Sequence, residues 1–344
     1  MAKVTKKIKD KFSKQEELHK TEKEKLDERR EEILAQGRKF KYPMQFAKHR
    51  LVFITIAIAF VALIGAAVFG WVSLYKNQST SDVAYRITTV LPVPVAKVDG
   101  ENVRFSDYLM IYRSSIMPVE QQNGSSDAAD DDTESIRKFY KRTALTEAEK
   151  YAYAIKLGKE NNIMVSKAQI NEAFNEHLKI GGAERSEDSF LKVLKDNFGL
   201  DKGEYQRMLY LSLMEVEVSK LIDVNATSKV EQAQKMLAEN GGDFRAVADA
   251  LGIEYEETGL IDIMNIDGGR STKAYEMEPG QISEPFVSQN GDCYYIIKVL
   301  GKADAKVAYV SLGIPFTELN TRFAQLRDEN KIQEYIELPM DGVQ

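Results

Sequence analysis

The stretch Leu51–Tyr75 is the strongest constraint on how this chain can fold. It holds 25 consecutive residues without a charge, in a sequence that is 29% charged. A helix of that length reaches about 37 Å, enough to cross a hydrocarbon core of about 30 Å. A buried helix of a soluble protein would keep a polar stripe, whereas here only Thr55, the glycines and Ser73 interrupt the apolar run. The stretch therefore predicts one membrane-spanning helix, with Trp71 and Tyr75 in an aromatic belt.

The charges on either side of this stretch predict its orientation. The twenty residues before it carry five Lys and Arg residues, and the twenty after it carry only Lys76 and Arg86. The more basic side stays in the cytoplasm, so we expect a single-pass cell-membrane protein with a cytoplasmic N-terminus. Residues 1–50 hold 16 basic and 9 acidic residues, and the rest of the chain holds 31 and 44. The acidic exterior argues against nucleic acid as a partner, and the basic segment suits anionic lipid.

The rarer residue types exclude several kinds of site. A single cysteine, Cys293, excludes an intramolecular disulfide. The three histidines, His19, His49 and His177, are too scattered to complete a zinc site with it. The sequence contains no GxxxxGK[ST] phosphate loop, so ATP use is not expected. We therefore expect no metal, no cofactor and no catalytic residue.

Composition divides the chain into six parts, and the fold class expected is a single transmembrane helix followed by α+β structure. The parts are a basic charged segment at 1–50, the membrane helix at 51–75, a polar tether at 76–92, a helical domain at 93–225 with a mobile acidic loop at 118–134, a small α+β domain at 226–302, and a C-terminal strand and helix at 303–344.

Turn and capping residues predict where the elements of the helical domain begin. Val93–Val103 has the pattern of a hairpin around the turn Asp99-Gly100, and Ser106 can cap the helix that follows. Three later helices have start or stop signals of the same kind, namely Ser166 with Gln169, Ser186 or Asp188 with Gly199, and Asp201 with Glu204.

The pattern changes after Asn225. Lys229–Asn240 and the stretch DFRAVADALG, capped by Asp243, have helical spacing. Strand-like GLIDIMNI follows, and then EPFVS and CYYIIKV form a predicted antiparallel hairpin joined at Asn290-Gly291. Lys306–Gly313 is another strand candidate, and Phe316–Ile336 is a final amphipathic helix.

Two regions resemble known families. Residues 95–222 resemble the N-terminal chaperone domain of the SurA, PrsA and PpiD foldases, through VAKVDGENVRFSDYL, ALTEAEKYAYAIKLGKENNIMVSKAQINEAF and FLKVLKDNFGLDKGEYQRML. Residues 229–300 resemble a parvulin-type peptidyl-prolyl isomerase domain, through GGDFRAVADALG, MEPGQISEPF and YYIIKVLG. The resemblance implies a helical substrate cradle with a parvulin-like α+β domain attached.

The isomerase resemblance fails at its two histidines. Tyr295 stands where the last-strand histidine would fall, and the first strand is not recognisable ahead of Lys229. The resemblance therefore implies a degenerate isomerase, and Cys293 is interpreted as a small hydrophobe. A residual substrate-binding groove is expected to be lined by Met264, Tyr275, Phe286, Tyr294 and Tyr295.

A missing first strand would leave an unpaired sheet edge, which proteins usually avoid. We therefore predict that Lys306–Gly313 folds back beside YYIIKV, with Val307 or Tyr309 touching Ile296. The alternative is that it pairs with Val93–Val98.

Three functions fit these patterns. The leading one is a membrane-anchored extracytoplasmic chaperone or foldase that binds unfolded or translocating polypeptides, next to the translocon, in an apolar cradle between its two domains. The second is an active prolyl isomerase with a remodelled pocket, because isomerisation needs no nucleophile. The third is a structural accessory subunit of an envelope complex.

Overall fold

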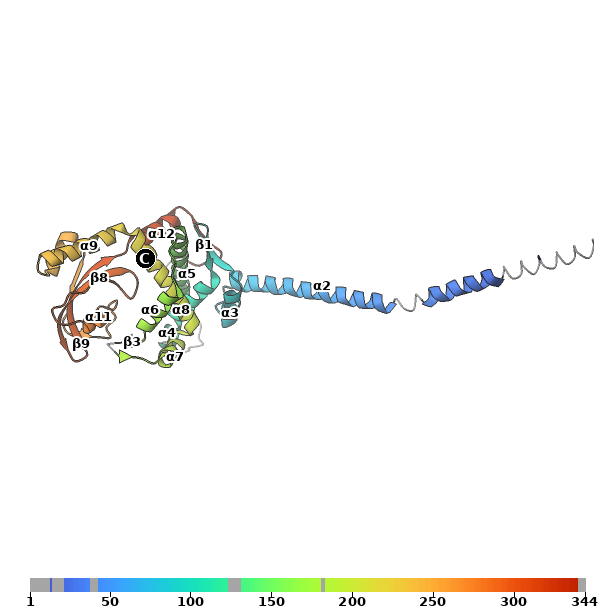
Figure 1. Ribbon diagram of the computed structural model, residues 1–344, viewed down its shortest axis with the longest axis horizontal. Coiled ribbons are helices and arrows are strands. Elements are labelled where there is room, and N and C mark those ends of the chain that lie inside the picture. Colours follow the sequence, from blue (N-terminus) through green and yellow to red (C-terminus); the bar gives the residue numbers. More distant parts are fainter. Residues whose placement is uncertain (1–12, 14–21, 38–42, 123–130, 181–182, 340–344) are drawn as a thin grey trace, which may run out of the picture. The chain divides into compact units, whose positions relative to one another are not determined.

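The computed structural model describes residues 13, 22–37, 43–122, 131–180 and 183–339 of the chain (Figure 1). The chain divides into two compact units, Met1–Val72 and Ser73–Gln344. Part of the predicted acidic loop, residues 123–130, lies outside the described residues. The rest of that prediction was wrong, because residues 118–122 continue one helix and residues 131–134 begin the next.

The first unit is helical where it is described. Residues 22–37 form an exposed helix, and α2 covers Pro43–Trp71 before a π-helical turn, η1, at Val72–Lys76. Within the described ranges, Arg50–Lys76 is the one helix with the length and composition to cross a membrane, and its most apolar window has a mean hydropathy of 2.9. None of that window is buried. The long apolar helix is as expected, and its topology stays a prediction.

The second unit begins at the end of the apolar stretch. Leu74 is buried, and the hydroxyl of Tyr75 donates to the carbonyl oxygen of Pro94 at 2.7 Å. The Tyr75 ring also meets the ring of Phe105 edge-on, at 5.8 Å between centroids. Residues 73–76 are therefore packed into the folded unit.

The predicted polar tether at 76–92 was wrong. Helix α3 forms at Asp82–Val90, and the side chain of Ser81 caps it by accepting from the amide of Ala84. Ala84, Tyr85 and Thr88 are buried against the rest of the unit. A helix of nine residues has too few turns for its apolar spacing to be recognised in the sequence, and it is stabilised by the surface on which it packs.

A helical lobe, residues 73–223 with 317–339, makes up most of the second unit. Strands β1 (Pro94–Val98) and β2 (Glu101–Arg104) form the predicted hairpin, with φ of 44° at Asp99 and 92° at Gly100. Such positive φ values suit a two-residue hairpin turn. Helix α4 covers Phe105–Gln122, so Ser106 lies inside its first turn and is not the predicted cap.

The other predicted caps are confirmed. Ser166 with Gln169 and Asp201 with Glu204 make complete capping boxes, Ser186 caps its helix, and Gly199 ends it with a φ of 68°. The elements that follow α4 in this lobe are α5 (Asp131–Glu160), α6 (Lys167–Glu176), β3 (Lys179–Ile180), β4 (Ala183–Glu184), α7 (Glu187–Phe198) and α8 (Lys202–Ile222).

The C-terminal segment belongs to the helical lobe. Helix α12 covers Glu318–Asp328 and buries Leu319, Phe323 and Leu326 in the same core as β1 and α5. The final helix predicted at Phe316–Ile336 is thus too long, because the chain turns at Asn330, with a φ of 55°, and forms strand β10. Strand β10, Ile332–Glu334, pairs with β1, which makes a sheet of order β10-β1-β2.

A sheet lobe, residues 224–316, is inserted between α8 and α12. Its main sheet has the order β5-β9-β8-β7, and every pairing in it is antiparallel. Its elements are α9 (Val224–Glu239), α10 (Phe244–Leu251), β5 (Glu254–Glu257), β6 (Ile261–Asp262), α11 (Arg270–Glu276), β7 (Phe286–Val287), β8 (Cys293–Ala303) and β9 (Lys306–Pro315).

The fold-back prediction is confirmed, although its named contacts were wrong. Strand β9 pairs with β8, as predicted, and not with β1, which was the alternative. The register places Leu312 opposite Ile296, and Tyr309 opposite Val299. The sequence also missed β5, whose mostly exposed residues lack an apolar alternation, and only Ile261–Asp262 of the predicted strand GLIDIMNI is extended.

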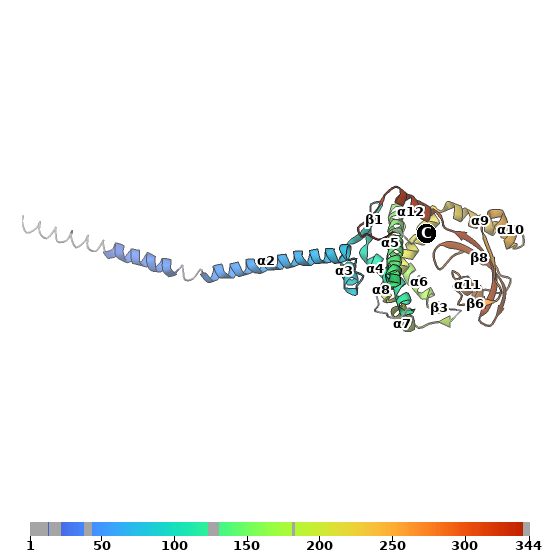
Figure 2. The same ribbon diagram turned by 180° about the vertical axis from the view of Figure 1, so that it is seen from behind.

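The sheet separates two apolar clusters. Ile296, Leu312 and Ile314 point toward α9 and α10, whereas Ile297, Val299 and Tyr309 point toward α11. Side chains alternate along a strand, so neighbouring residues serve opposite faces. Figures 1 and 2 show α9 and α10 outside the curve of the sheet and α11 inside it.

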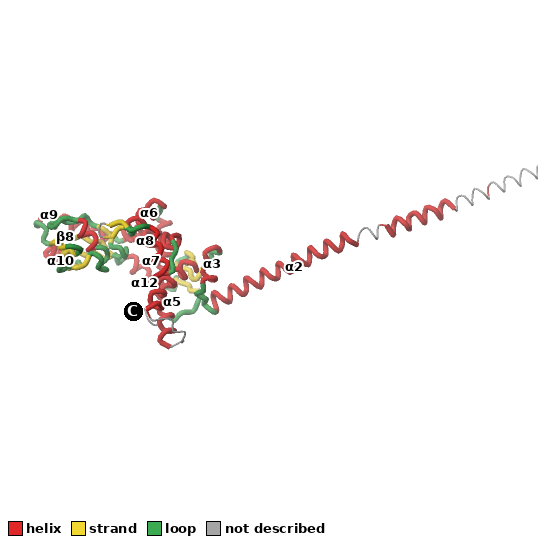
Figure 3. The backbone as a smooth tube through the Cα atoms, turned by 90° about the horizontal axis from the view of Figure 1, so that it is seen from below, coloured by secondary structure: helices red, strands yellow, loops and turns green. Residues whose placement is uncertain are grey.

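One carboxylate binds both chain connections between the lobes, the one from α8 to α9 and the one from β9 to α12. Asp223, which is buried, caps α9 by accepting from the amide of Ala226 at 2.9 Å, and it accepts from the amides of Thr317 and Glu318 at 2.7 and 3.0 Å. Burial alone would raise the pKa of Asp223, but these donors outweigh burial and lower it. Figure 3 shows the two lobes side by side, and Gly291 at the β7–β8 turn adds a contact, because a Cβ there would come within 2.9 Å of Val216 on α8.

Replacing Asp223 tests this junction. We expect Asp223→Ala to lower the free energy of unfolding by about 2–4 kcal/mol, because a helix cap and two further charge-assisted bonds are lost. Urea unfolding of residues 73–344 measures the loss. Asp201→Ala, which removes one exposed cap within one lobe, is the matched control and should cost about 1 kcal/mol. Equal losses for the two variants would contradict the role of Asp223 in joining the lobes.

A buried ionic cluster holds the C-terminal segment against α5. The guanidinium of Arg142 donates to both carboxylate oxygens of Glu334, at 2.6 and 3.1 Å, and to the carbonyl oxygen of Pro339. Glu149, which is fully buried, accepts from Arg327 of α12 at 3.1 Å. Burial, reinforced by the Glu334 carboxylate, raises the pKa of Glu149 to about 7.

This raised pKa predicts a pH dependence of stability. Between the ordinary pKa of a glutamate and about 7, the folded chain holds a proton at Glu149 that the unfolded chain has lost. The free energy of unfolding therefore falls as pH rises through that range. We expect Glu149→Gln to be more stable relative to wild type at pH 8 than at pH 5, by about 1–3 kcal/mol in urea unfolding. Glu147→Gln on the same helix is the control, and an unchanged difference at the two pH values would contradict the prediction.

Candidate functional site

The predicted groove residues do not all lie together. Phe286 and Tyr295 are neighbours on β7 and β8, with ring centroids 6.0 Å apart. Tyr294 points to the opposite face of the sheet, where its ring meets Phe316 at 4.7 Å. The structure thus brings together two of the three aromatic residues of this hairpin.

The other two candidates are elsewhere in the sheet lobe. The ring of Tyr275 on α11 lies 5.3 Å from the ammonium of Lys302, near the far end of β8. Met264 is exposed in the turn that follows β6. A groove lined by all five residues therefore does not form in this arrangement.

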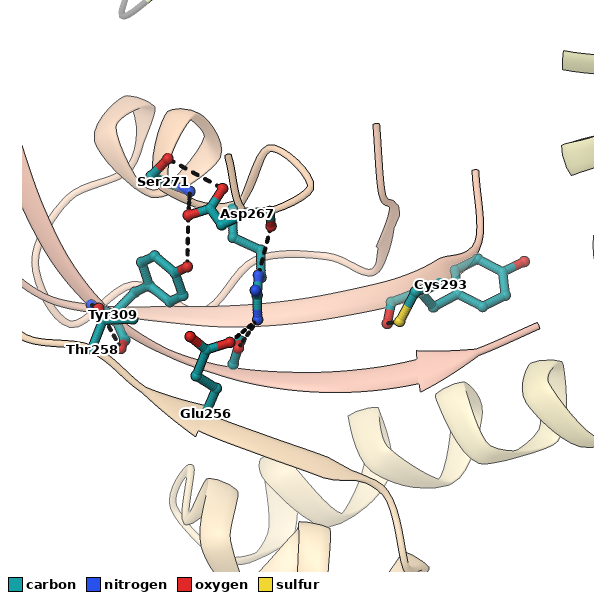
Figure 4. Close-up of polar contacts among 9 residues, drawn as sticks. Glu256, Thr258, Asp267, Ser271, Cys293 and Tyr309 are labelled. Atoms are coloured by element: carbon teal, nitrogen blue, oxygen red, sulfur yellow. Dashed lines mark hydrogen bonds and ion pairs between the residues drawn. The ribbon is translucent and has the colours of Figure 1, made fainter. Parts of the chain in front are cut away.

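Arg270 fills the face of the sheet that carries Tyr295. Its guanidinium carbon lies 4.6 Å from the centroid of the Tyr295 ring and 5.8 Å from that of Tyr309. The guanidinium also donates to the Glu256 carboxylate and, at 3.1 Å, to the hydroxyl of Ser311 (Figure 4). No local sequence pattern indicated this role, because the partners of Arg270 on the sheet, Glu256 and Ser311, lie 14 and 41 residues away along the chain.

A buried carboxylate completes this polar cluster. Asp267 accepts from the hydroxyl of Tyr309 at 2.7 Å and from the amide and hydroxyl of Ser271 at 3.0 and 3.2 Å (Figure 4). Burial, together with the Asp267 carboxylate, raises the pKa of Tyr309. A phenol held in this way keeps its proton at neutral pH, so the bond between Tyr309 and Asp267 supports the fold.

Cys293 lies away from the cluster (Figure 4). Its thiol is buried and donates to the carbonyl oxygen of Tyr294 at 3.2 Å. Burial raises the pKa of Cys293 to about 11, so little thiolate exists at neutral pH. Among the residues that the structure describes, no three His, Cys, Asp or Glu side chains converge on a metal position.

The helical lobe contains a cavity of about 1320 Å³. It lies among α3, α4, the first turns of α5, and the connection between α7 and α8, with residues 77–80 at its edge. Met110, Ile116, Met117 and Phe198 give it an apolar side. Sequence reasoning missed this cavity, because its walls come from segments more than a hundred residues apart.

The rest of the cavity wall combines uncharged polar side chains with charged ones. Arg207 makes two bonds to the Asp107 carboxylate, at 3.0 and 2.6 Å, and Arg113 lies 2.9 Å from Asp82. Burial, and then the nearby Arg137, lowers the pKa of Lys141. Four cations of the wall have no carboxylate within 4 Å among the described residues, namely Arg86, Arg104, Lys141 and Lys195.

A cavity of this kind can hold an extended polypeptide segment. Its methionine and aromatic side chains accept apolar residues of different shapes. Its cations can bind backbone carbonyl oxygens or acidic side chains without requiring one sequence. The volume exceeds that of ordinary small-molecule pockets, which run from about 300 to 1,000 Å³.

Comparison with known families identifies the helical lobe. Residues 44–218, just over half of the chain, match the family model of the SurA-like N-terminal domain. The chain therefore belongs to the family of proteins with a SurA-like N-terminal domain, which fits a chaperone or foldase role. Comparisons with curated proteins and with solved structures found no match.

Replacing Arg270 tests how the sheet face is held. We expect Arg270→Ala to lower the free energy of unfolding by about 1–3 kcal/mol, because two ring contacts and a part-buried ion pair are lost. Urea unfolding measures this change. Arg245→Ala is the matched control, since Arg245 also lies over a tyrosine ring, that of Tyr255, but is exposed. A loss at Arg270 no larger than at Arg245 would contradict the assignment.

Proposed function

We propose that this protein is a membrane-anchored chaperone that binds unfolded or translocating polypeptides outside the cytoplasm. The observation that carries the proposal is the family match, which runs without interruption from the apolar helix into the helical lobe. A domain of this family is suited to binding unfolded chains. Because the match includes the apolar stretch, anchor and lobe form one functional unit, and the translocon is the natural neighbour of such a unit.

The orientation rests on charge. Five Lys and Arg residues precede the apolar stretch within twenty residues and two follow it, so the N-terminus is cytoplasmic and the lobes are outside. The basic segment 1–50 then faces anionic lipid of the cytoplasmic leaflet.

The cavity of the helical lobe is the binding site that we propose for clients. Its apolar side, at Met110, Met117 and Phe198, receives side chains, while its cations hold the backbone. This site differs from the cradle between the lobes that the sequence suggested. It uses residues of the family-matched segment alone, from α3 to α8.

The sheet lobe is, in this proposal, a degenerate parvulin-type isomerase domain. Supporting this, β9 occupies the place beside β8 that a missing first strand would leave empty. Tyr295 takes the place of a histidine, and Arg270 covers its ring. The second candidate function, an active isomerase with a remodelled pocket, is favoured only by the Phe286–Tyr295 pair, which could contact a proline.

Site-specific photo-crosslinking in the full chain, reconstituted in lipid nanodiscs, tests the client site. A photoreactive residue at Phe198, which lines the cavity, should crosslink a permanently unfolded polypeptide at least fivefold more than one at Val193. Both positions are partly exposed on α7, but Phe198 lines the cavity and Val193 does not, so the comparison isolates the effect of the cavity. Equal crosslinking at both would refute the cavity as the client site.

Two activity assays on the same preparation separate the candidate functions. The chaperone proposal predicts suppressed aggregation of several unrelated unfolded proteins and no acceleration of proline-limited refolding. Acceleration by the wild type would establish the isomerase instead, with Tyr295→His showing whether a histidine there increases it. Absence of both activities would favour a structural accessory subunit.

A further inference from the structure

Helix α3 presents an apolar face to the outside of the helical lobe. The exposed fractions are 67% for Val83, 47% for Ile87, 80% for Val90 and 55% for Leu91, just past the helix end. These residues are spaced i, i+4, i+7 and i+8, so they form one stripe along the helix. Contiguous exposed apolar residues, unlike scattered ones, mark an interaction surface.

The stripe is held outward by the packing of the opposite side of α3. Tyr85 is buried, and the guanidinium of Arg113 lies 4.6 Å from the centroid of its ring. Arg113 also pairs with Asp82 at the start of the helix, at 2.9 Å. The helix therefore cannot roll to hide its apolar face without breaking these contacts.

The chain between the apolar stretch and α3 is short. The folded unit begins at Ser73, and Val83 follows Lys76, the end of the span candidate, by seven residues. Seven extended residues reach at most about 25 Å, and the bond from the amide of Ser79 to the carbonyl oxygen of Ser73 shortens this path. Val83 of α3 therefore stays within about 25 Å of Lys76.

We propose that the apolar stripe of α3 docks on the interfacial region of the lipid bilayer on the side of the folded lobes. This inference rests on the proposed membrane anchor. The stripe is too small to bind a membrane alone, but the neighbouring span makes the contact effectively intramolecular, so a weak affinity is sufficient.

Docking would also fix the position of the proposed client site. The side of α3 away from the stripe contributes Asp82, Tyr85 and Thr89 to the cavity wall. A helix that touches lipid with one side and clients with the other holds the cavity at the membrane surface.

Fluorescence quenching by spin-labelled lipid tests this docking in the full chain. A Val90→Cys substitution carries a polarity-sensitive nitrobenzoxadiazole label, and the vesicles contain phosphatidylcholine, phosphatidylglycerol and a lipid with a nitroxide near its headgroup. The native Cys293 stays in place because it is buried. The matched control is Met164→Cys, which is 86% exposed in the same lobe. We expect quenching at Val90 at least threefold stronger than at Met164, and equal quenching would overturn the inference.

A third labelled position separates failure of the docking from failure of the anchor. Phe60→Cys lies within the apolar stretch and should be quenched by a nitroxide deep in the acyl chains. Quenching at Phe60 without quenching at Val90 overturns the docking alone, whereas no quenching at Phe60 overturns the anchor. A further sample contains a second copy that carries a nitroxide at position 90. If this copy quenches the label at position 90 and the nitroxide lipid does not, the stripe binds another copy of the chain and the lipid proposal is wrong.

Discussion

The bond network of Asp223 is the constraint on which the arrangement of the second unit depends. The sheet lobe interrupts the helical lobe, so the chain must leave after α8 and return before α12. One buried carboxylate meets both crossings, since its donors are the amide of Ala226 on the way out and the amides of Thr317 and Glu318 on the way back. The two connections cannot separate without breaking charge-assisted hydrogen bonds to this carboxylate, which is costly.

The helical lobe is consequently built from both ends of the second unit. Strand β10 completes the small sheet beside β1, and Arg142 holds this strand through Glu334 and the segment after it through Pro339. The family-matched segment ends at residue 218, before this C-terminal part. The cavity and the apolar stripe of α3 therefore lie in a lobe whose core is closed by residues far outside the match, which links their geometry to the intact chain.

The two lobes differ in what their surfaces can do. In the sheet lobe, Arg270, Asp267 and Tyr309 satisfy one another, and the side chains of the lobe itself cover the face around Tyr295. In the helical lobe, a cavity is lined both by apolar residues and by cations that have no carboxylate within 4 Å among the described residues. Binding without a fixed sequence is therefore better suited to the helical lobe, and the sheet lobe is better suited to a supporting or residual role.

The sequence by itself determined the features that depend on residues near one another. These are the apolar helix, the capping boxes at Ser166 and Asp201, the hairpin at Asp99-Gly100 and the fold-back of β9. Only the tertiary structure decided the packing of α3, the register of β9 and the place of β10. It also decided the cavity of the helical lobe and the position of Arg270 over Tyr295, which no local pattern indicated. The physical reason is that each of these is stabilised by partners distant in sequence, whose contacts exist only once the chain has folded.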